Sequence, residues 1–279
     1  MSRSSAARWV FLMFVLLSGC ALVITSCQKA GTNVEDMYTI TATAGDNGTI
    51  DPSGAVKVKY GGDQQFSVSP DPGYKIEDVA VDGAFVGQVE EYLFTKVVED
   101  HSITASFIEK TASDLIVEGW QAFAGRNYRL AGSLFAGALG KDSTIIDAYL
   151  GAGWSHARLN DLTTAALDFN TGLGRSSTNL DLNAGLAFVF NAQKLYAQSE
   201  NLALNVIQVN PGWSFSRDTS VSTSDLHLLL AQDYFAEARY DLSLQQVKIL
   251  NPSFIITDVS TVSGQTALAQ EIERLRAIA

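Results

Sequence analysis

The chain has 279 residues and a formal net charge of −11, from 19 lysine and arginine residues against 30 aspartate and glutamate residues. With 47% hydrophobic and 18% charged residues, its composition excludes a disordered tail. The acidic balance leaves little basic surface to neutralise phosphates, so we expect no nucleic-acid partner. Both cysteines lie within the first 27 residues, which excludes a disulfide framework, a zinc knuckle and a cysteine nucleophile in the folded part.

The first segment has the layout of an export signal. Arg3 and Arg8 precede an unbroken apolar run over residues 9–17 (WVFLMFVLL), which is too short to span a bilayer alone. Extension of this run through Ile24 approaches the length of a spanning helix, so an uncleaved membrane anchor is the alternative.

Two tetrapeptides in this region end in a cysteine: residues 17–20 (LSGC) and residues 24–27 (ITSC). Each resembles the lipobox of bacterial lipoproteins. The resemblance implies that the cysteine receives diacylglycerol and becomes the first mature residue. Cys20 has the more typical box, but apolar residues follow it, whereas Cys27 precedes a polar stretch (QKAGTN). We therefore expect lipidation at Cys27, with Cys20 as the alternative.

These features predict a lipoprotein signal peptide over residues 1–26 and a tether over residues 27–37. Removal of the signal takes away two arginines and no acidic residue, so the formal charge falls from −11 to −13. A chain this acidic needs its lipid to stay on an anionic membrane. Neither cysteine is followed by aspartate, which by resemblance to proteobacterial sorting favours the outer membrane. We expect an exported, lipid-anchored protein on the periplasmic face or the cell surface.

Residues 38–108 alternate β-branched with polar residues between glycine and proline turn signals. Stretches such as YTITATA and AVKVKY predict six or seven short antiparallel strands, enough for a small sandwich. The expected inward-facing residues are Ile40, Ala42, Val56, Val58, Phe66, Val68, Ile76, Val79, Val81, Phe94, Ile103 and Phe107.

Ordered motifs in this segment carry a resemblance to a known family. They include the opening YTIT at residue 38, the turn PDPGY at residue 70, VDG at residue 81 and the closing DHSITASF at residue 100. The segment resembles the bacterial repeat domains related to the internalin B-repeat. The resemblance implies a non-catalytic spacer or an accessory binding module.

From residue 112 the sequence becomes alanine-rich and repeats with a period of 34 residues. A fourth copy fits when its frame is moved by ten residues, which are absorbed in the polar loop Gly212–Ser222. The equivalent positions include Gly119, Gly153 and Ala187; Tyr128, Leu162 and Tyr196; and Phe135, Phe169 and Ala203.

These features resemble the tetratricopeptide repeat (TPR) over residues 112–252. The resemblance implies pairs of antiparallel helices stacked into a solenoid. Residues 263–279 predict a closing amphipathic helix, with Leu268, Ile272, Leu275 and in one alternative Ile278 covering the last pair. The expected fold class is therefore multidomain, with a small all-β antiparallel module followed by an all-α TPR-like solenoid.

In the TPR family the first helix of each pair lines a concave groove. The resemblance places Trp120, Phe123, Trp154, Arg158 and Phe188 in that groove. An exposed aromatic strip there would anchor an extended peptide or a sugar chain. The alternative is that the rings pack under the closing helix or against the β module.

Three aspartates recur at the starts of the predicted first helices: Asp147, Asp181 and Asp225. We expect them to cap these helices and to match the helix dipole, rather than to contact a ligand.

The sequence contains no nucleophile elbow, H-E-x-x-H motif or phosphate-binding loop in a supporting context. We therefore expect no enzyme activity, no metal site and no cofactor. The predicted function is a non-catalytic, lipid-anchored envelope protein whose TPR-like part binds envelope proteins or supports an assembly. The alternative is a glycan-binding or adhesive surface lipoprotein.

Overall fold

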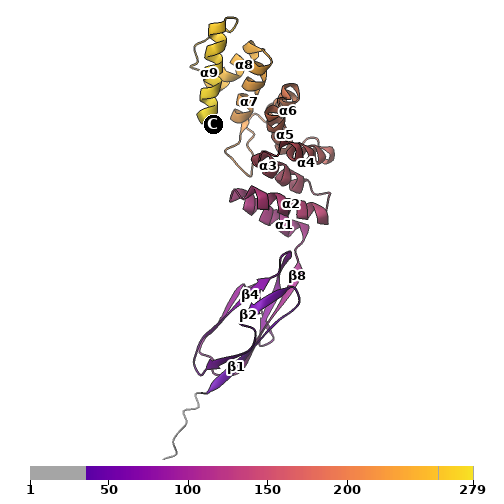
Figure 1. Ribbon diagram of the computed structural model, residues 1–279, viewed down its shortest axis with the longest axis vertical. Helices are drawn as coiled ribbons and strands as arrows, with labels where there is room; N and C mark the ends of the chain where they lie inside the picture. The colour runs from indigo at the N-terminus through magenta and orange to yellow at the C-terminus, as the bar shows by residue number, and fades with distance from the viewer. Residues whose placement is uncertain (1–35, 257, 279) are drawn as a thin grey trace, which may run out of the picture.

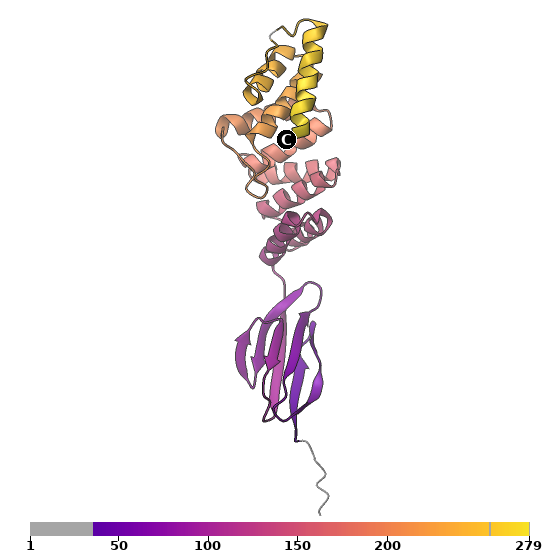
Figure 2. The same ribbon diagram turned by 90° about the vertical axis from the view of Figure 1, so that its left-hand side faces the viewer.

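The computed structural model describes residues 36–256 and 258–278. Strands occupy residues 37–109 and helices occupy residues 112–278, and the two parts follow one another along the long axis of an elongated molecule (Figure 1 and Figure 2). Cys20 and Cys27 lie outside the described residues. Within the described ranges, every helix is too short or too polar to traverse a lipid bilayer.

In the described residues, eight strands form two sheets, with the orders β3-β1-β8-β5-β6 and β2-β4-β7. Buried side chains from both sheets, including Phe66 and Val79, form one core between them. Of the residues expected to face inward, Val56 and Phe107 are only partly buried. The strands are β1 (Met37–Ala44), β2 (Gly48–Asp51), β3 (Gly54–Lys59), β4 (Gln64–Pro70), β5 (Tyr74–Val81), β6 (Ala84–Gly87), β7 (Glu91–Phe94) and β8 (His101–Glu109).

The first and last strands are neighbours and run in parallel, with Ile40 opposite His101 and Ala44 opposite Ala105. The prediction of purely antiparallel strands is wrong at this pair. Since β1 and β8 run in the same direction, the chain enters the module at one end and leaves it at the other, where α1 begins (Figure 1). An antiparallel pair would bring the entry and the exit to the same end.

Over residues 112–278, as far as the structure describes them, the helices form four antiparallel pairs and a closing helix. The first helices of three pairs begin at residues 112, 146 and 180, and their second helices begin at residues 128, 162 and 196, which confirms the period of 34. The last second helix begins at residue 240, ten residues beyond that period. The helices are α1 (Ala112–Ala124), α2 (Tyr128–Lys141), α3 (Ile146–Arg158), α4 (Leu162–Arg175), α5 (Leu180–Ala192), α6 (Tyr196–Val209), α7 (Thr223–Ala236), α8 (Tyr240–Leu250) and α9 (Val262–Ile278).

Each helix pair turns at a residue with a left-handed backbone. The φ angle is 59° at Arg126, 60° at Asn160, 62° at Lys194 and 59° at Ala238. This conformation reverses the chain between the helices in a few residues. The four turns are thus built alike, although none of them contains glycine at this position.

Buried phenylalanines wedge between successive pairs against glycines. A Cβ atom at Gly119 would lie 2.8 Å from the Phe135 ring, and a Cβ atom at Gly151 would overlap the same ring. Phe169 repeats this arrangement one pair later, between Gly153 and Gly185. Small residues therefore let the helices approach closely enough to enclose each ring.

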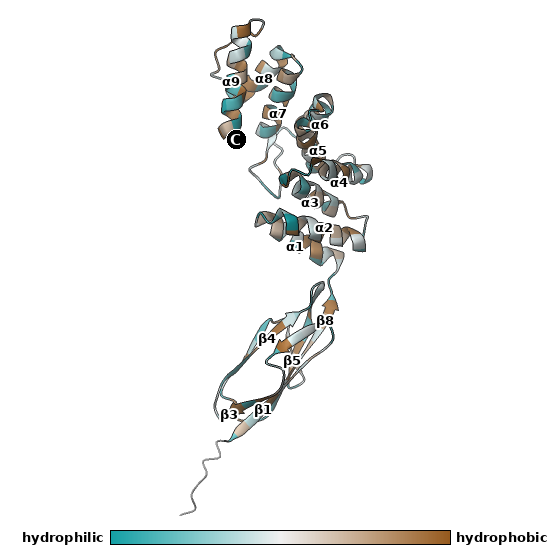
Figure 3. Ribbon diagram, in the orientation of Figure 1, coloured by the Kyte–Doolittle hydropathy of each residue, from teal (hydrophilic) through white to brown (hydrophobic). Residues whose placement is uncertain are grey.

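The closing helix α9 packs on the last pair. Leu268, Ile272 and Leu275 are buried against residues of α7 and α8, whereas Ile278 is 69% exposed and covers nothing. Figure 3 shows hydrophobic and hydrophilic residues alternating along α9, as expected for a helix with one buried face.

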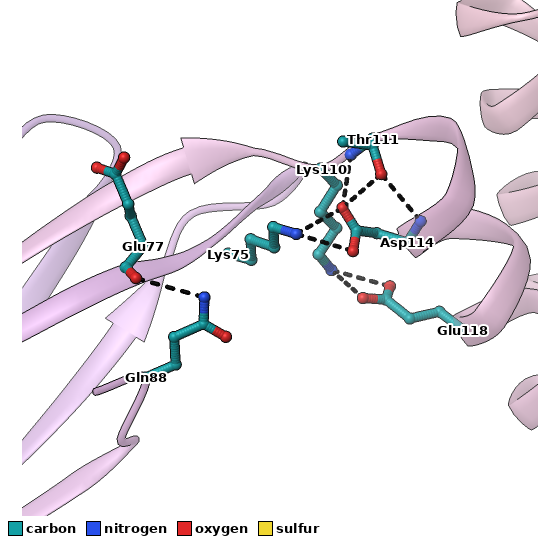
Figure 4. A network of polar contacts seen from close by, with 7 residues as sticks. All are labelled: Lys75, Glu77, Gln88, Lys110, Thr111, Asp114 and Glu118. Carbon is teal, nitrogen blue, oxygen red and sulfur yellow. Dashed lines mark hydrogen bonds and ion pairs between the residues drawn. The ribbon is translucent and has the colours of Figure 1, made fainter.

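The β module and the helices meet at a short, polar junction (Figure 4). Only Lys110 separates the end of β8 from Thr111, the N-cap of α1. The backbone N–H of Lys110 donates to the Gly73 carbonyl at 2.9 Å. Lys75 donates to Asp114 at 2.9 Å, and the Lys110 ammonium donates to Glu118 at 2.9 Å. Lys75 and Thr111 together lower the pKa of Asp114 to about 2.

Candidate functional site

The first helices α1, α3 and α5 lie side by side and present one aromatic residue each, one repeat apart. Trp120, Trp154 and Phe188 form this series, and the Trp154 ring centroid lies 6.0 Å from that of Phe188. The structure therefore brings the three residues of the predicted aromatic strip onto one face. We call this face, formed by α1, α3 and α5, the groove.

The groove is filled by the chain's own connection between α6 and α7. Phe215 of this connection is fully buried, and its ring stacks on Trp154 with centroids 4.6 Å apart and planes 16° apart. Its centroid also lies 6.2 Å from that of Trp120 and 6.4 Å from that of Phe123. We call residues 211–222 the insert loop.

The expectation of an exposed aromatic strip is therefore wrong for two of its three residues, since Trp120 is 8% exposed and Trp154 is 4% exposed. The element that covers them is neither the closing helix nor the β module, the two coverings considered from sequence. It is the insert loop, which was predicted only as a polar connection. Phe188, on α5, remains partly buried at the edge of the loop.

Polar contacts fix the insert loop to the groove at three places. The Trp213 indole Nε1 donates to Asp181 at 2.7 Å. The Arg217 guanidinium lies 4.6 Å from the Trp120 ring centroid and donates to Asp147 at 3.3 Å. The loop's contacts with α1, α3 and α5 therefore combine aromatic stacking, a cation–π interaction and hydrogen bonds to carboxylates.

A third polar contact joins Arg158 to the far end of the loop, where its guanidinium donates to Asp218 at 2.7 Å. The Ser220 hydroxyl and Arg158 both lower the pKa of Asp218, against a smaller effect of burial. Arg158, predicted as a groove cation, is thus engaged by the loop.

The recurrent aspartates do not share one role. Asp225 forms a capping box with Ser222 at the start of α7, as expected. Asp147 instead accepts the Trp120 indole N–H at 3.0 Å, and Asp181 accepts that of Trp213. Burial raises the pKa of Asp181, because an ionised carboxylate loses solvation there.

A smaller opening remains beside the insert loop. It has a volume of about 260 Å³ and is lined by Trp154, Ala157, Arg158, Phe188, Val221 and Asp225. One wall therefore belongs to the loop and the others to the groove and α7. This opening lies where the insert loop, the groove and α7 meet.

Trp213, Phe215 and Arg217 were not among the groove residues predicted from sequence. They alternate with serines over five positions inside the insert loop. Two aromatic residues and a cation, in a loop longer than the other connections of the array, were the available signal.

Two of the three histidines each join the two helices of a pair. His156 Nδ1 on α3 lies 2.7 Å from Asp168 on α4, and His227 Nδ1 on α7 lies 2.8 Å from Gln246 on α8. Burial raises the pKa of Asp168 despite the hydrogen bond from His156. No group of three or more His, Cys, Asp or Glu residues in the described ranges is arranged to hold a metal ion.

Comparison with protein-family profiles and with curated protein sequences gave no match. Among solved structures, a crystal structure of the MamA protein is similar over 60% of this chain and 75% of its own, with 11% identity and a TM-score of 0.43. TTC0263, a thermophilic TPR protein of Thermus thermophilus, is similar over 59% of this chain and 83% of its own, with 18% identity and a TM-score of 0.41. The TPR-like character of this chain rests on its own helix pairs and their period.

Proposed function

We propose that this chain is a non-catalytic, lipid-anchored protein of the bacterial cell envelope whose TPR-like part binds a protein partner or supports an assembly. The observation that carries this proposal is the groove itself, which already holds a segment of the chain that turns back on itself, through Phe215, Trp213 and Arg217. A surface that fits one segment by its side chains is suited to another of similar chemistry.

The glycan-binding alternative was favoured by two features, the β module and an exposed aromatic strip. The strip does not offer Trp120 and Trp154 to sugars, because both rings are buried under the insert loop. Protein binding, which the contacts of that loop support, is the function that we develop below.

The lipid anchor is tested by the intact mass of the protein in membrane fractions. We compare the wild type with Cys20→Ser and Cys27→Ser. Loss of the lipidated mature species in Cys27→Ser alone is the expected result, because Cys27 precedes the polar tether. Retention of that species in both variants would contradict the anchor, and loss in Cys20→Ser alone would move it to the other cysteine.

Partner binding is tested by photo-crosslinking in cells. A benzoyl-phenylalanine at position 188, at the edge of the groove, is compared with one at position 167, where Leu167 is exposed on α4. A crosslinked protein specific to position 188 is expected. The same adducts at both positions, or none at either, would count against the groove as a binding site.

A further inference from the structure

The insert loop touches the groove in the manner of a bound peptide. Trp213, Phe215 and Arg217 alternate along the chain and reach α5, α3 and α1 respectively through the Asp181, Trp154 and Trp120 contacts described above. Trp213 and Phe215 flank Ser214, which forms an antiparallel bridge with Ser222, and Arg217 lies in the turn that follows, where the Asp218 N–H donates to the Phe215 carbonyl at 3.1 Å. The loop therefore contacts the first helices of three successive pairs.

The backbone of the loop closes on itself. Phe215 N–H donates to the Val221 carbonyl at 2.9 Å, Val221 N–H to the Asp218 carbonyl at 3.0 Å, and Thr223 N–H to the Trp213 carbonyl at 3.0 Å. Among the described residues, no backbone hydrogen bond joins the loop to α1, α3 or α5. Because only side chains hold it, the loop can leave the groove without breaking its own backbone bonds.

The indole contacts reveal a second arrangement of the groove. Trp120 donates to Asp147, and the equivalent residues one repeat later are Trp154 and Asp181. Asp181 instead accepts from Trp213 of the loop, while the buried Trp154 Nε1 has no partner in the described part of the chain. An unpaired buried donor costs free energy. If the loop left the groove, the hydrogen bond from the Trp213 indole to Asp181 would be lost. Asp181 could then accept a hydrogen bond from the Trp154 indole, which would replace it.

The acidic residues of the groove determine the charge of the segment that it can bind. Asp147 and Asp181 face the loop, and Arg217 of the loop interacts with both carboxylates. The opening beside Val221 gives an incoming segment a first contact with Phe188 and Trp154 before the loop is displaced. A ligand with aromatic residues and a positive charge fits these groups.

We propose that the groove of α1, α3 and α5 binds a segment of a partner protein that turns back on itself as the insert loop does, with aromatic residues at its first and third positions and an arginine at its fifth. The insert loop is the intramolecular competitor for this site. The proposal rests on the proposed function and adds the class of ligand and the way in which access is controlled. A tethered competitor acts at an effective concentration of about millimolar, so only a segment that binds well displaces it.

The test uses the full chain in detergent and, as the probe, a fluorescent peptide with the sequence of residues 210–222 (NPGWSFSRDTSVS). Fluorescence anisotropy is measured for the wild type and for a Trp213→Ser/Phe215→Ser variant, whose loop no longer fills the groove. The variant is expected to bind the probe at least about ten-fold more tightly, because the competitor is gone. A control peptide with serine at both aromatic positions should not bind.

A second variant guards against misfolding of the first. Arg217→Glu keeps both loop aromatics but turns the contact with Asp147 into a repulsion, and Arg217 is partly exposed. It should bind the probe more tightly than the wild type by a few-fold. Arg129→Glu on α2 makes the same charge change at an exposed position away from the groove and should leave binding unchanged.

The proposal is overturned if Arg217→Glu, with an unchanged circular dichroism spectrum, binds the probe no more tightly than Arg129→Glu. It is also overturned if the serine control peptide binds equally well. If crosslinking at position 188 still succeeds in that case, the loop is a fixed part of the wall, and partner binding stands without the competitor. Failure of both experiments removes the groove as a binding site.

Discussion

At the scale of single residues, Asp233 is a buried carboxyl group of the helical part with a raised pKa. It is fully buried on α7, and its Oδ1 accepts from the Asn191 amide at 2.7 Å, while Oδ2 has no partner among the described residues. The nearby Ser199 hydroxyl donates to the Ala187 carbonyl instead. Burial raises the pKa of Asp233 to about 6, and the charges of Glu237 and Glu200 act in the same direction.

This shift predicts a pH-dependent stability. The folded-state pKa is raised above the ordinary value of 3.8, so the stability contributed by the protonated carboxyl is present below about pH 4 and lost as the pH rises through about 6. The shift corresponds to about 3 kcal/mol. Asp233→Asn should therefore gain stability relative to the wild type between pH 4 and pH 7.5 by an amount of this order, as measured by urea unfolding at 222 nm.

Asp241→Asn, on the exposed start of α8, is the control for this experiment. Its stability difference from the wild type should change little between the two pH values. An equal difference at both pH values for Asp233→Asn would mean that the buried carboxyl is ionised without cost, against the burial seen here.

At the scale of elements, the helices and the position of the insert loop could be predicted, but the contact of that loop with the groove could not. The period of 34 could be recognised because residues that pack the helices together, such as Gly119 and Phe135, recur in the next pair. They recur because each pair repeats the same contact. The contact between Phe215 and Trp154 occurs once and joins segments that no period relates. The sequence therefore placed the groove residues on one face, but it did not reveal what covers them.

The wedge between pairs gives a test of element packing. In Gly151→Ala the new methyl group would overlap the buried Phe135 ring, so the variant should lose about 1–3 kcal/mol of unfolding free energy. Gly140→Ala, near the end of α2, meets no atom within 4 Å and should gain up to about 1 kcal/mol from helix propensity. Thermal and urea unfolding measure both. Equal effects would show that α3 can move away from the ring.

At the scale of the whole molecule, the change in composition near residue 110 predicts two parts, but not their contact. Lys75 on β5 meets Asp114 on α1 only because β8 pairs with β5 and leads directly into α1. The parallel pair of β1 and β8 then places Met37, at the start of β1, and the helices at opposite ends of the β module (Figure 1). With the lipid anchor that we propose above, the module would hold the groove away from the membrane.

A spacer of this kind must be stiff at its junction. We therefore predict that Lys75→Ala/Lys110→Ala broadens the distribution of distances between spin labels on the two parts, at Ser53→Cys and Gln198→Cys in a chain with Cys20→Ser and Cys27→Ser. Both ion pairs are partly exposed, so the unfolding free energy should change by less than about 1 kcal/mol per pair. Pulsed electron paramagnetic resonance measures the distances.

Lys194→Ala/Lys248→Ala removes the same charge elsewhere and should leave the distribution narrow. An unchanged distribution in the junction variant would mean that the single-residue connection and the Lys110–Gly73 backbone bond suffice to fix the angle.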